Sequence, residues 1–354
     1  MITQWLLFGA GLAGLIAGAE LLVRGASRLA LSFGISPLVV GLTVVAFGTS
    51  APEMSVSVGA VLDGRTELAL GNAVGSNVFN VLFILGIAAL IAPLAVHRQV
   101  IRQEAPILIG SAVLLLVLSL DGVIGGFDAA LLTGLLVAYT VFLIRQARAE
   151  PPDEAELPAA DRSPRWLHIV FVIAGLALLV GGAQALVAAA VSFARALGVS
   201  EVVIGLTIVA AGTSLPEVAA SVMAAWKGER DIAVGNVVGS CVFNILGVIG
   251  LGGLAALALP GDVGLAVPPA VMHFDLWVML AALVACLPVF LTGREVARWE
   301  GGVFLAYYVA YTTYLVMRAQ DHAILPAFSA TMMGFVVPLT IVTLVVSLFQ
   351  RRPR

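Results

Sequence analysis

The chain has 354 residues, of which 61% are hydrophobic and only 11% are charged, and its formal net charge is −3. A soluble domain carries about 25% charged residues, so this composition and the mean hydropathy of +1.08 exclude a water-soluble globular protein. The two cysteines, Cys241 and Cys286, both lie in apolar runs, which argues against a disulfide framework or a zinc site.

Eleven apolar stretches are long enough to cross a bilayer as helices, which requires about 20 residues each. The fourth stretch is short, and the seventh contains polar residues. We interpret the first as a retained span and not a signal peptide, because it has neither a basic leader nor a small-residue cleavage site. In chain order, the spans are expected near residues 3–23, 36–61, 68–92, 105–120, 126–144, 166–190, 200–226, 232–258, 273–291, 299–317 and 325–349.

The distribution of Lys and Arg predicts the orientation of these spans. If the N-terminus lies outside, the cytoplasmic side carries 15 of the 18 basic residues, and the opposite side carries only Arg65, Arg195 and Arg318. This asymmetry follows the positive-inside rule. We therefore expect a multi-pass protein of the cell membrane, with the C-terminus and a Pro-rich acidic linker at 146–165 in the cytoplasm. The sequence shows no organelle targeting segment, which favours the plasma membrane of a prokaryote.

An internal repeat covers the second and third spans and the seventh and eighth spans. Residues 36–80 align without a gap with residues 200–244, and 25 of the 45 positions are identical. The sequence GLTVVAFGTSAPE returns as GLTIVAAGTSLPE, and GNAVGSNVFN returns as GNVVGSCVFN. A weaker match, VAYT at 137–140 and at 309–312, extends the repeat to the fifth and tenth spans.

The two copies start five predicted spans apart, so the second copy enters the membrane from the opposite face. Inverted repeats of this kind are typical of secondary transporters, whose binding site lies near the middle of the membrane. We therefore predict an all-α polytopic membrane protein with two inverted-topology five-helix repeats and an eleventh helix. Its expected parts are the first repeat at 1–145, the linker at 146–165, the second repeat at 166–318, and the extra helix with a basic tail at 319–354.

Each copy places one acid inside an apolar segment, Glu53 in the first and Glu217 in the second. An acid at the centre of a membrane helix costs about 2.5–3.5 kcal/mol, and neither motif contains a Lys or Arg to pair with it. Pro52 and Pro216 precede the acids and remove a helical N–H, which frees backbone carbonyls one turn earlier. Broken backbone is tolerated in a membrane only where it is buried in protein or lines a cavity. The pattern therefore predicts a cation site.

The other repeated polar residues are also oxygen donors. Thr49 and Ser50 are expected on the same helix face as Glu53, and Ser76 on the same face as Asn80. The second copy repeats them as Thr213, Ser214, Ser240 and Asn244. Glycines four residues apart, at 71, 75, 235 and 239, permit close helix approach.

Oxygen donors without His or Cys indicate a hard cation. Calcium binds about 6–8 oxygens in flexible sites. The two acids would neutralise one calcium ion or hold sodium ions in its place. Competition between the two ions for one site is sufficient for exchange.

These motifs resemble the two alpha repeats of the cation/calcium exchanger superfamily, in particular prokaryotic sodium/calcium antiporters. The resemblance covers the first ten spans. It implies that calcium is bound by Glu53 and Glu217 together with backbone carbonyls of Thr49 and Thr213. It also implies that the first and sixth helices slide across a rigid core. The residues that it assigns to sodium sites are Ala46, Ala210, Ser50, Ser214, Ser76, Ser240, Asn80 and Asn244.

Two departures from the family pattern matter. Some members carry Asp where this chain has Asn244, so the coupling ion, sodium or proton, stays open. The chain also lacks the large cytoplasmic calcium-sensing insert of animal exchangers.

The leading hypothesis is a secondary antiporter that exchanges calcium for sodium by alternating access. Proton/calcium exchange is the close alternative, because both acids could carry protons. A cation channel is a more distant alternative. An enzyme is not expected, because there is no HExxH motif and the four histidines lie near predicted span ends, where interfacial positions are expected. The sequence predicts no cofactor beyond the transported ions and no nucleic-acid partner, and it indicates no protein partner.

Overall fold

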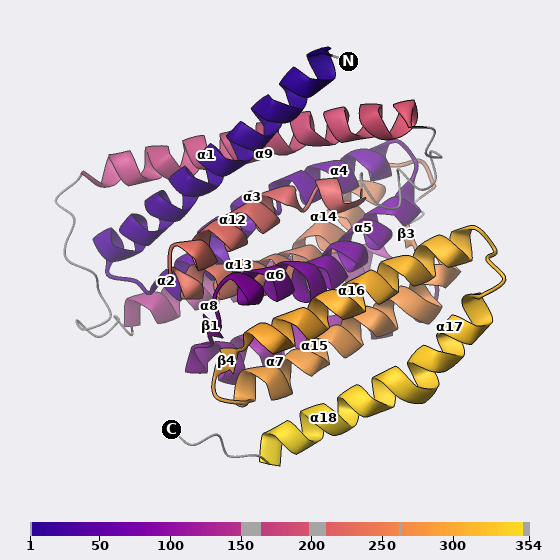
Figure 1. Cartoon of the computed structure of the whole chain (residues 1–354). Helices are drawn as coiled ribbons and strands as arrows, with labels where there is room; N and C mark the ends of the chain where they lie inside the picture. The colour runs from indigo at the N-terminus through magenta and orange to yellow at the C-terminus, as the bar shows by residue number, and fades with distance from the viewer. Residues whose placement is uncertain (1, 150–163, 198–209, 262–263, 350–354) are drawn as a thin grey trace.

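The computed structural model describes residues 2–149, 164–197, 210–261 and 264–349, which form a bundle of membrane-length helices (Figure 1). Two helices of 32 residues each, α1 (Ile2–Phe33) and α9 (Arg165–Ala196), cross one face of the bundle (Figure 1). Among the described residues, nine helical segments are long and apolar enough to span a membrane. The fold is therefore the predicted all-α polytopic one, and the first part of the seventh span and most of the linker lie outside the described residues.

Several spans combine α-helical segments with π-helical turns, here labelled η. The first repeat continues with α2 (Pro37–Val40), η1 (Gly41–Val45), α3 (Ala46–Thr49), α4 (Ala51–Leu62), α5 (Thr66–Val78), η2 (Phe79–Ile84), α6 (Leu85–Ile91), η3 (Val100–Glu104), α7 (Ala105–Leu118) and α8 (Gly126–Ala149). After α9, the second repeat contains α11 (Ala210–Gly212), α12 (Leu215–Trp226), α13 (Arg230–Val242), η6 (Phe243–Val248), α14 (Ile249–Ala256), η7 (Val271–Asp275), α15 (Leu276–Leu291) and α16 (Arg298–Ala319). The eleventh span consists of α17 (Leu325–Thr331), η8 (Met332–Val336) and α18 (Val337–Phe349).

Helices α1 and α9 are longer than the predicted spans 3–23 and 166–190. A helix of 32 residues is about 48 Å long, whereas the hydrocarbon core of a bilayer is about 30 Å thick. Arg24 and Arg28, which fall between the predicted spans 3–23 and 36–61, therefore lie inside α1. Hydropathy alone ended these helices too early, because their charged ends extend beyond the apolar window.

Helices α1 and α9 are packed backbone against backbone. A Cβ atom on Gly18 would lie 2.7 Å from the backbone nitrogen of Leu179 and 2.8 Å from the carbonyl oxygen of Gly175. In lipid, small residues let helices approach closely enough for dispersion to hold them together. His168 lies in the first turn of α9, near the end of the span as predicted, and its side chain is buried within the protein. The two helices form one unit.

Polar contacts join α1 to the core near the end of α12. Glu20 of α1 forms ion pairs with Arg24 and with Lys227, which follows α12. The hydroxyl of Ser27 donates a hydrogen bond to Oε1 of Glu229 at 2.8 Å.

Helix α13 and the turn after it form the centre of the bundle. Every residue from Ile232 to Gly250 is buried. A Cβ on Gly235 or Gly239 would lie 2.8 or 2.7 Å from a backbone oxygen of the second span, which confirms the predicted close approach. By the repeat alignment, Gly71 and Gly75 would face residues within 198–209, which lie outside the described residues. The close approach at Gly71 and Gly75 therefore stays a prediction.

The repeat extends beyond the aligned motifs. The hydroxyl of Tyr139 donates to Glu104 Oε2 at 2.8 Å, and the hydroxyl of Tyr311 donates to Asp275 Oδ1 at 2.7 Å. Each of these hydrogen bonds lies within one repeat, and the two bonds join equivalent pairs of helices. Both tyrosines belong to the VAYT segments, whose sequence match is weak.

Two short sheets also join the repeats. Strand β1 (Leu94–Ala95) pairs antiparallel with β4 (Glu295–Val296), and β2 (Val123–Ile124) pairs antiparallel with β3 (Leu265–Ala266). Each sheet connects a loop of one repeat with a loop of the other, and these four strands are the small departure from an all-helical fold in the described residues.

Candidate functional site

Both GTSxPE motifs interrupt their helices at the serine, two residues before the proline. Ser50 separates α3 from α4 with φ −80° and ψ 0°, and Ser214 precedes α12 with φ −90° and ψ 8°. Glu53 and Glu217 therefore lie in the first turn of α4 and α12. The N-terminal turn of a helix has free N–H groups and a positive dipole end, so it stabilises a carboxylate. Proline is accommodated in the first turn because an N–H at this position would have no partner within the helix.

Each acid is held by the serine of the other repeat. Ser214 Oγ donates to Glu53 Oε1 at 2.9 Å, and Ser50 Oγ donates to Glu217 Oε1 at 3.2 Å. Ser214 Oγ is also 3.3 Å from Ser76 Oγ. These exchanged contacts bring the two acids into one buried site. Ser50 was predicted on the same helix face as Glu53, and the structure adds that its hydroxyl bonds to the acid of the opposite repeat.

The site concentrates buried polar atoms that have no hydrogen-bond partner. Seven of the ten such atoms in the described residues belong to predicted ligands. Buried polar groups in proteins are nearly always paired with protein, water or an ion, so this concentration marks a place that binds something polar. The seven atoms are Glu53 Oε2, Glu217 Oε2, Asn80 Oδ1 and Nδ2, Asn244 Oδ1, Ser240 Oγ and Thr213 Oγ1.

No basic side chain among the described residues neutralises the two acids. The ion pairs of Glu20 with Arg24 and Lys227, and of Asp63 with Arg65, do not involve the two acids. Glu53 and Glu217 are essentially inaccessible to solvent, at 0% and 1% exposure, and they interact electrostatically with each other. When both acids are ionised, their buried charges require a positive partner, because unpaired buried charges are strongly unfavourable. The arrangement therefore suits a cation.

The predicted backbone ligands fall into two kinds. The carbonyl of Ala46 accepts from the backbone N–H of Ser50 at 3.0 Å and lies 3.4 Å from the hydroxyl of Thr49, so it already has protein partners. The side chain of Thr49 donates to Asn236 Oδ1 at 3.1 Å, which leaves its carbonyl as the group for an ion. Ala210 begins α11, and its side chain lies outside what the structure describes.

The amides that support the site were not among the residues predicted from the sequence. Asn236 accepts from Thr49, and its Nδ2 donates to Ser221 Oγ at 2.9 Å and to the carbonyl of Glu217 at 3.4 Å. In the first repeat, Asn72 Nδ2 donates to Ser57 Oγ at 3.0 Å. These asparagines and serines are identical in the two copies, so the repeat alignment contains the signal that could have identified them.

Replacing Asn236 by Ala should destabilise the protein. The change leaves the hydroxyls of Thr49 and Ser221 buried with fewer partners, which costs about 1–3 kcal/mol. We expect a lower midpoint of thermal unfolding in detergent. Asn72→Ala is the matched control with a smaller expected loss, because the described contacts of Asn72 include a single side-chain bond. Equal midpoints for Asn236→Ala and the unmodified protein would contradict this role.

Comparison with known proteins adds independent evidence. The sodium/calcium exchanger protein family matches residues 3–145 and 167–317, so the match ends before α17. The sodium/calcium exchanger MaX1 of Methanosarcina acetivorans is 33% identical over 89% of this chain and 99% of its own length. The inner membrane protein YrbG of Escherichia coli is 37% identical over 54% of this chain, which spans 60% of YrbG. A structure of the sodium-calcium exchanger NCX_Mj superimposes with a TM-score of 0.76 and 29% identity, over 89% of this chain and 99% of that one.

Proposed function

Because this chain belongs to the sodium/calcium exchanger protein family, we propose that it is a secondary antiporter that exchanges calcium for sodium at the site between Glu53 and Glu217. The observation that carries the proposal is the exchanged pair of serine–glutamate hydrogen bonds. It places two carboxylates from opposite repeats in one buried site, each with a free Oε2.

Calcium fits the donor set of this site. Two carboxylates match the charge of one divalent cation, and the carbonyls of Thr49 and Thr213 add neutral oxygens. Calcium accepts such irregular oxygen shells of about 6–8 donors, whereas magnesium requires near-ideal octahedral geometry. Sulfur and imidazole ligands are absent from the described part of the site, which disfavours zinc and copper.

Sodium is the proposed exchange partner. Asn80, Asn244 and Ser240 offer further neutral oxygens from segments that pack against the helices of the two acids, and sodium ions can use these while they replace the charge of calcium. Both equivalent positions hold asparagine and not an acid, so the two glutamates are the acids of the proposed ligand set. Proton/calcium exchange through those glutamates is the competing proposal.

The proposed transport cycle uses the α1–α9 unit as the moving part. These two helices pack tightly on each other, and α1 contacts the core through the Glu20–Lys227 ion pair and the Ser27–Glu229 hydrogen bond. Sliding of this unit would expose the site alternately to the two sides. We propose the division into repeats at 1–145 and 166–318, with the N-terminus outside and the C-terminus in the cytoplasm of a prokaryotic cell.

Sodium-loaded liposomes containing the protein should accumulate calcium-45 after dilution into sodium-free buffer. Vesicles loaded with choline in place of sodium, and vesicles with only a proton gradient, should show background uptake. Uptake driven by the proton gradient alone would replace sodium by protons as the coupling ion. Calcium flux that equilibrates without any coupling gradient would indicate a channel. A folded protein that moves no calcium under any condition would refute the substrate assignment.

A further inference from the structure

Asn77 is a buried amide beside the site, and it is not one of the proposed ligands. It lies in α5, three residues before Asn80, and no part of it is exposed. The second repeat has Cys241 at the equivalent position. The structure gives these two residues different tasks.

The hydrogen bonds of Asn77 fix which way its amide points. Its Nδ2 lies 3.4 Å from the carbonyl oxygen of Cys241 and 3.4 Å from the Sδ of Met279. Neither atom can donate a hydrogen bond, so the NH₂ group of Asn77 must face them. Its Oδ1 therefore faces the other way, where it accepts from Asn244 Nδ2 at 3.1 Å.

The orientation of Asn77 in turn fixes the orientation of Asn244. The NH₂ group of Asn244 is used by Asn77, so its Oδ1 is the amide atom left for a ligand, and this atom is buried without a partner. An amide can bind a cation only through its oxygen, and a rotated amide would present the NH₂ group to the ion. Asn244 is thus set in its binding orientation before any ion arrives.

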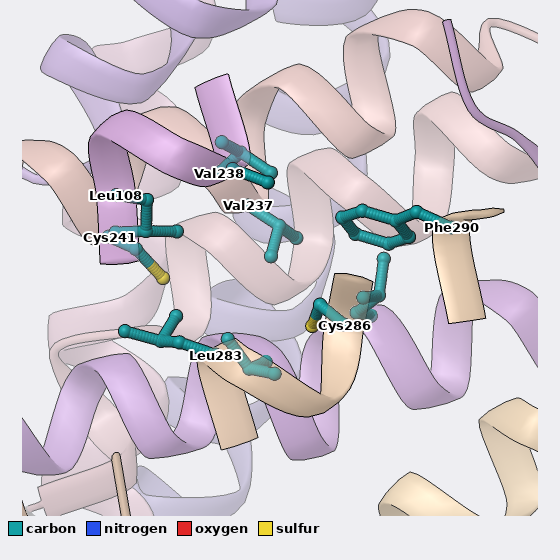
Figure 2. A pocket seen from close by; sticks show the side chains of 10 residues that line it. Leu108, Val237, Val238, Cys241, Leu283, Cys286 and Phe290 are labelled. Atoms are coloured by element: carbon teal, nitrogen blue, oxygen red, sulfur yellow. The ribbon is translucent and has the colours of Figure 1, made fainter. Parts of the chain in front are cut away.

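The equivalent place in the other half lacks this device. The thiol of Cys241 lies near Asn80, but a thiol is a weak donor and a weak acceptor. Both amide atoms of Asn80 are without a hydrogen-bond partner within the described residues. Figure 2 shows Cys241 at the wall of a small apolar cavity together with Leu283 and Cys286. Its volume of about 10 Å³ is close to the minimum for one water molecule, and its apolar wall disfavours one.

We propose that Asn77 is a positioning residue that holds Asn244 with its carbonyl oxygen toward the transported cation, whereas Asn80 has only the weakly bonding thiol of Cys241 in the equivalent place. The two repeats would then contribute unequally to ion binding, with a preset ligand from the second and an adjustable one from the first. This inference rests on the proposed function, because it requires a cation at the site.

The test is calcium-45 equilibrium binding to the purified full-length protein, with a double-mutant cycle. Asn77→Cys copies the second repeat and should weaken calcium binding about tenfold, because outer-shell partners of ligands typically contribute 10–100-fold to metal affinity. In an Asn244→Ala background, Asn77→Cys should have no further effect. A purely structural role of Asn77 would instead give additive losses. Additive losses, or unchanged binding by Asn77→Cys, would overturn the proposal.

The mirror variant gives a second, independent test. Cys241→Asn supplies Asn80 with the amide partner that Asn244 already has, and it should tighten calcium binding about tenfold by the same reasoning. This variant decides the question if Asn77→Cys does not fold, and unchanged or weaker binding would then overturn the proposal. Calcium binding to the unmodified protein distinguishes a failure of the proposed function from a failure of the role given to Asn77. If it fails to bind calcium, the proposed function is wrong; if it binds but neither variant changes the affinity, only the role of Asn77 is wrong.

Discussion

Glu53→Gln and Glu217→Gln should each abolish sodium-driven calcium uptake. Glutamine keeps the size of the side chain and can still accept the hydrogen bond from the serine of the opposite repeat. What it removes is one negative charge from a site that has no basic side chain among the described residues. At an effective dielectric constant of about 20, two unit charges 4 Å apart interact by about 4 kcal/mol, and a divalent ion doubles this. We therefore expect uptake to fall at least about 100-fold.

Two further variants make this result interpretable. Glu53→Asp keeps the charge but shortens the side chain, so it should retain measurable uptake above that of Glu53→Gln. Glu67→Gln removes an exposed acid from the start of α5 and should transport normally. Calcium-45 uptake into sodium-loaded liposomes measures all of them, with thermal unfolding as the check on folding. Substantial uptake by a folded Glu53→Gln or Glu217→Gln protein would place the calcium site elsewhere.

Gly18→Leu should disrupt the unit formed by α1 and α9. The first atom of any side chain at Gly18 would lie 2.7 Å from backbone atoms of α9, which cannot move aside as a side chain can. To accommodate the side chain, α1 and α9 must move apart along their interface, and both helices then lose close packing contacts. Overpacking in tight cores costs about 1–3 kcal/mol and occasionally more, and a clash with backbone favours the upper end. We expect a much lower midpoint of thermal unfolding and loss of transport.

Gly9→Leu is the matched control on the same helix. A Cβ at Gly9 meets no atom within 4 Å, and this position faces outward. The control should therefore unfold and transport like the unmodified protein. If Gly18→Leu and Gly9→Leu are equally stable, the tight packing of α1 on α9 does not contribute to the folded state.

The sequence by itself determined the class of fold, and it predicted the chemical kind of site. Lipid requires long apolar helices, so hydropathy located ten of the spans at helices of the structure. The duplication keeps Glu53 and Glu217 at equivalent positions, and an odd number of spans between the copies inverts the second. Pro52 and Pro216 mark the helix breaks, because the loss of an N–H is a local property of the chain. Each of these features can be read from a single segment of the sequence or from the alignment of the two repeats.

Only the tertiary structure decided which groups meet across the repeats. Helical periodicity places Ser50 on a face of its own helix, but the packing of the inverted halves determines that this face meets Glu217. The contact between Asn77 and Asn244 likewise joins residues 167 positions apart, and no local pattern predicts it. The equivalence of the Tyr139–Glu104 and Tyr311–Asp275 hydrogen bonds is likewise seen only in the structure. Helical periodicity determines the face of the helix on which a side chain lies. The packing of the helices determines which residue that side chain contacts.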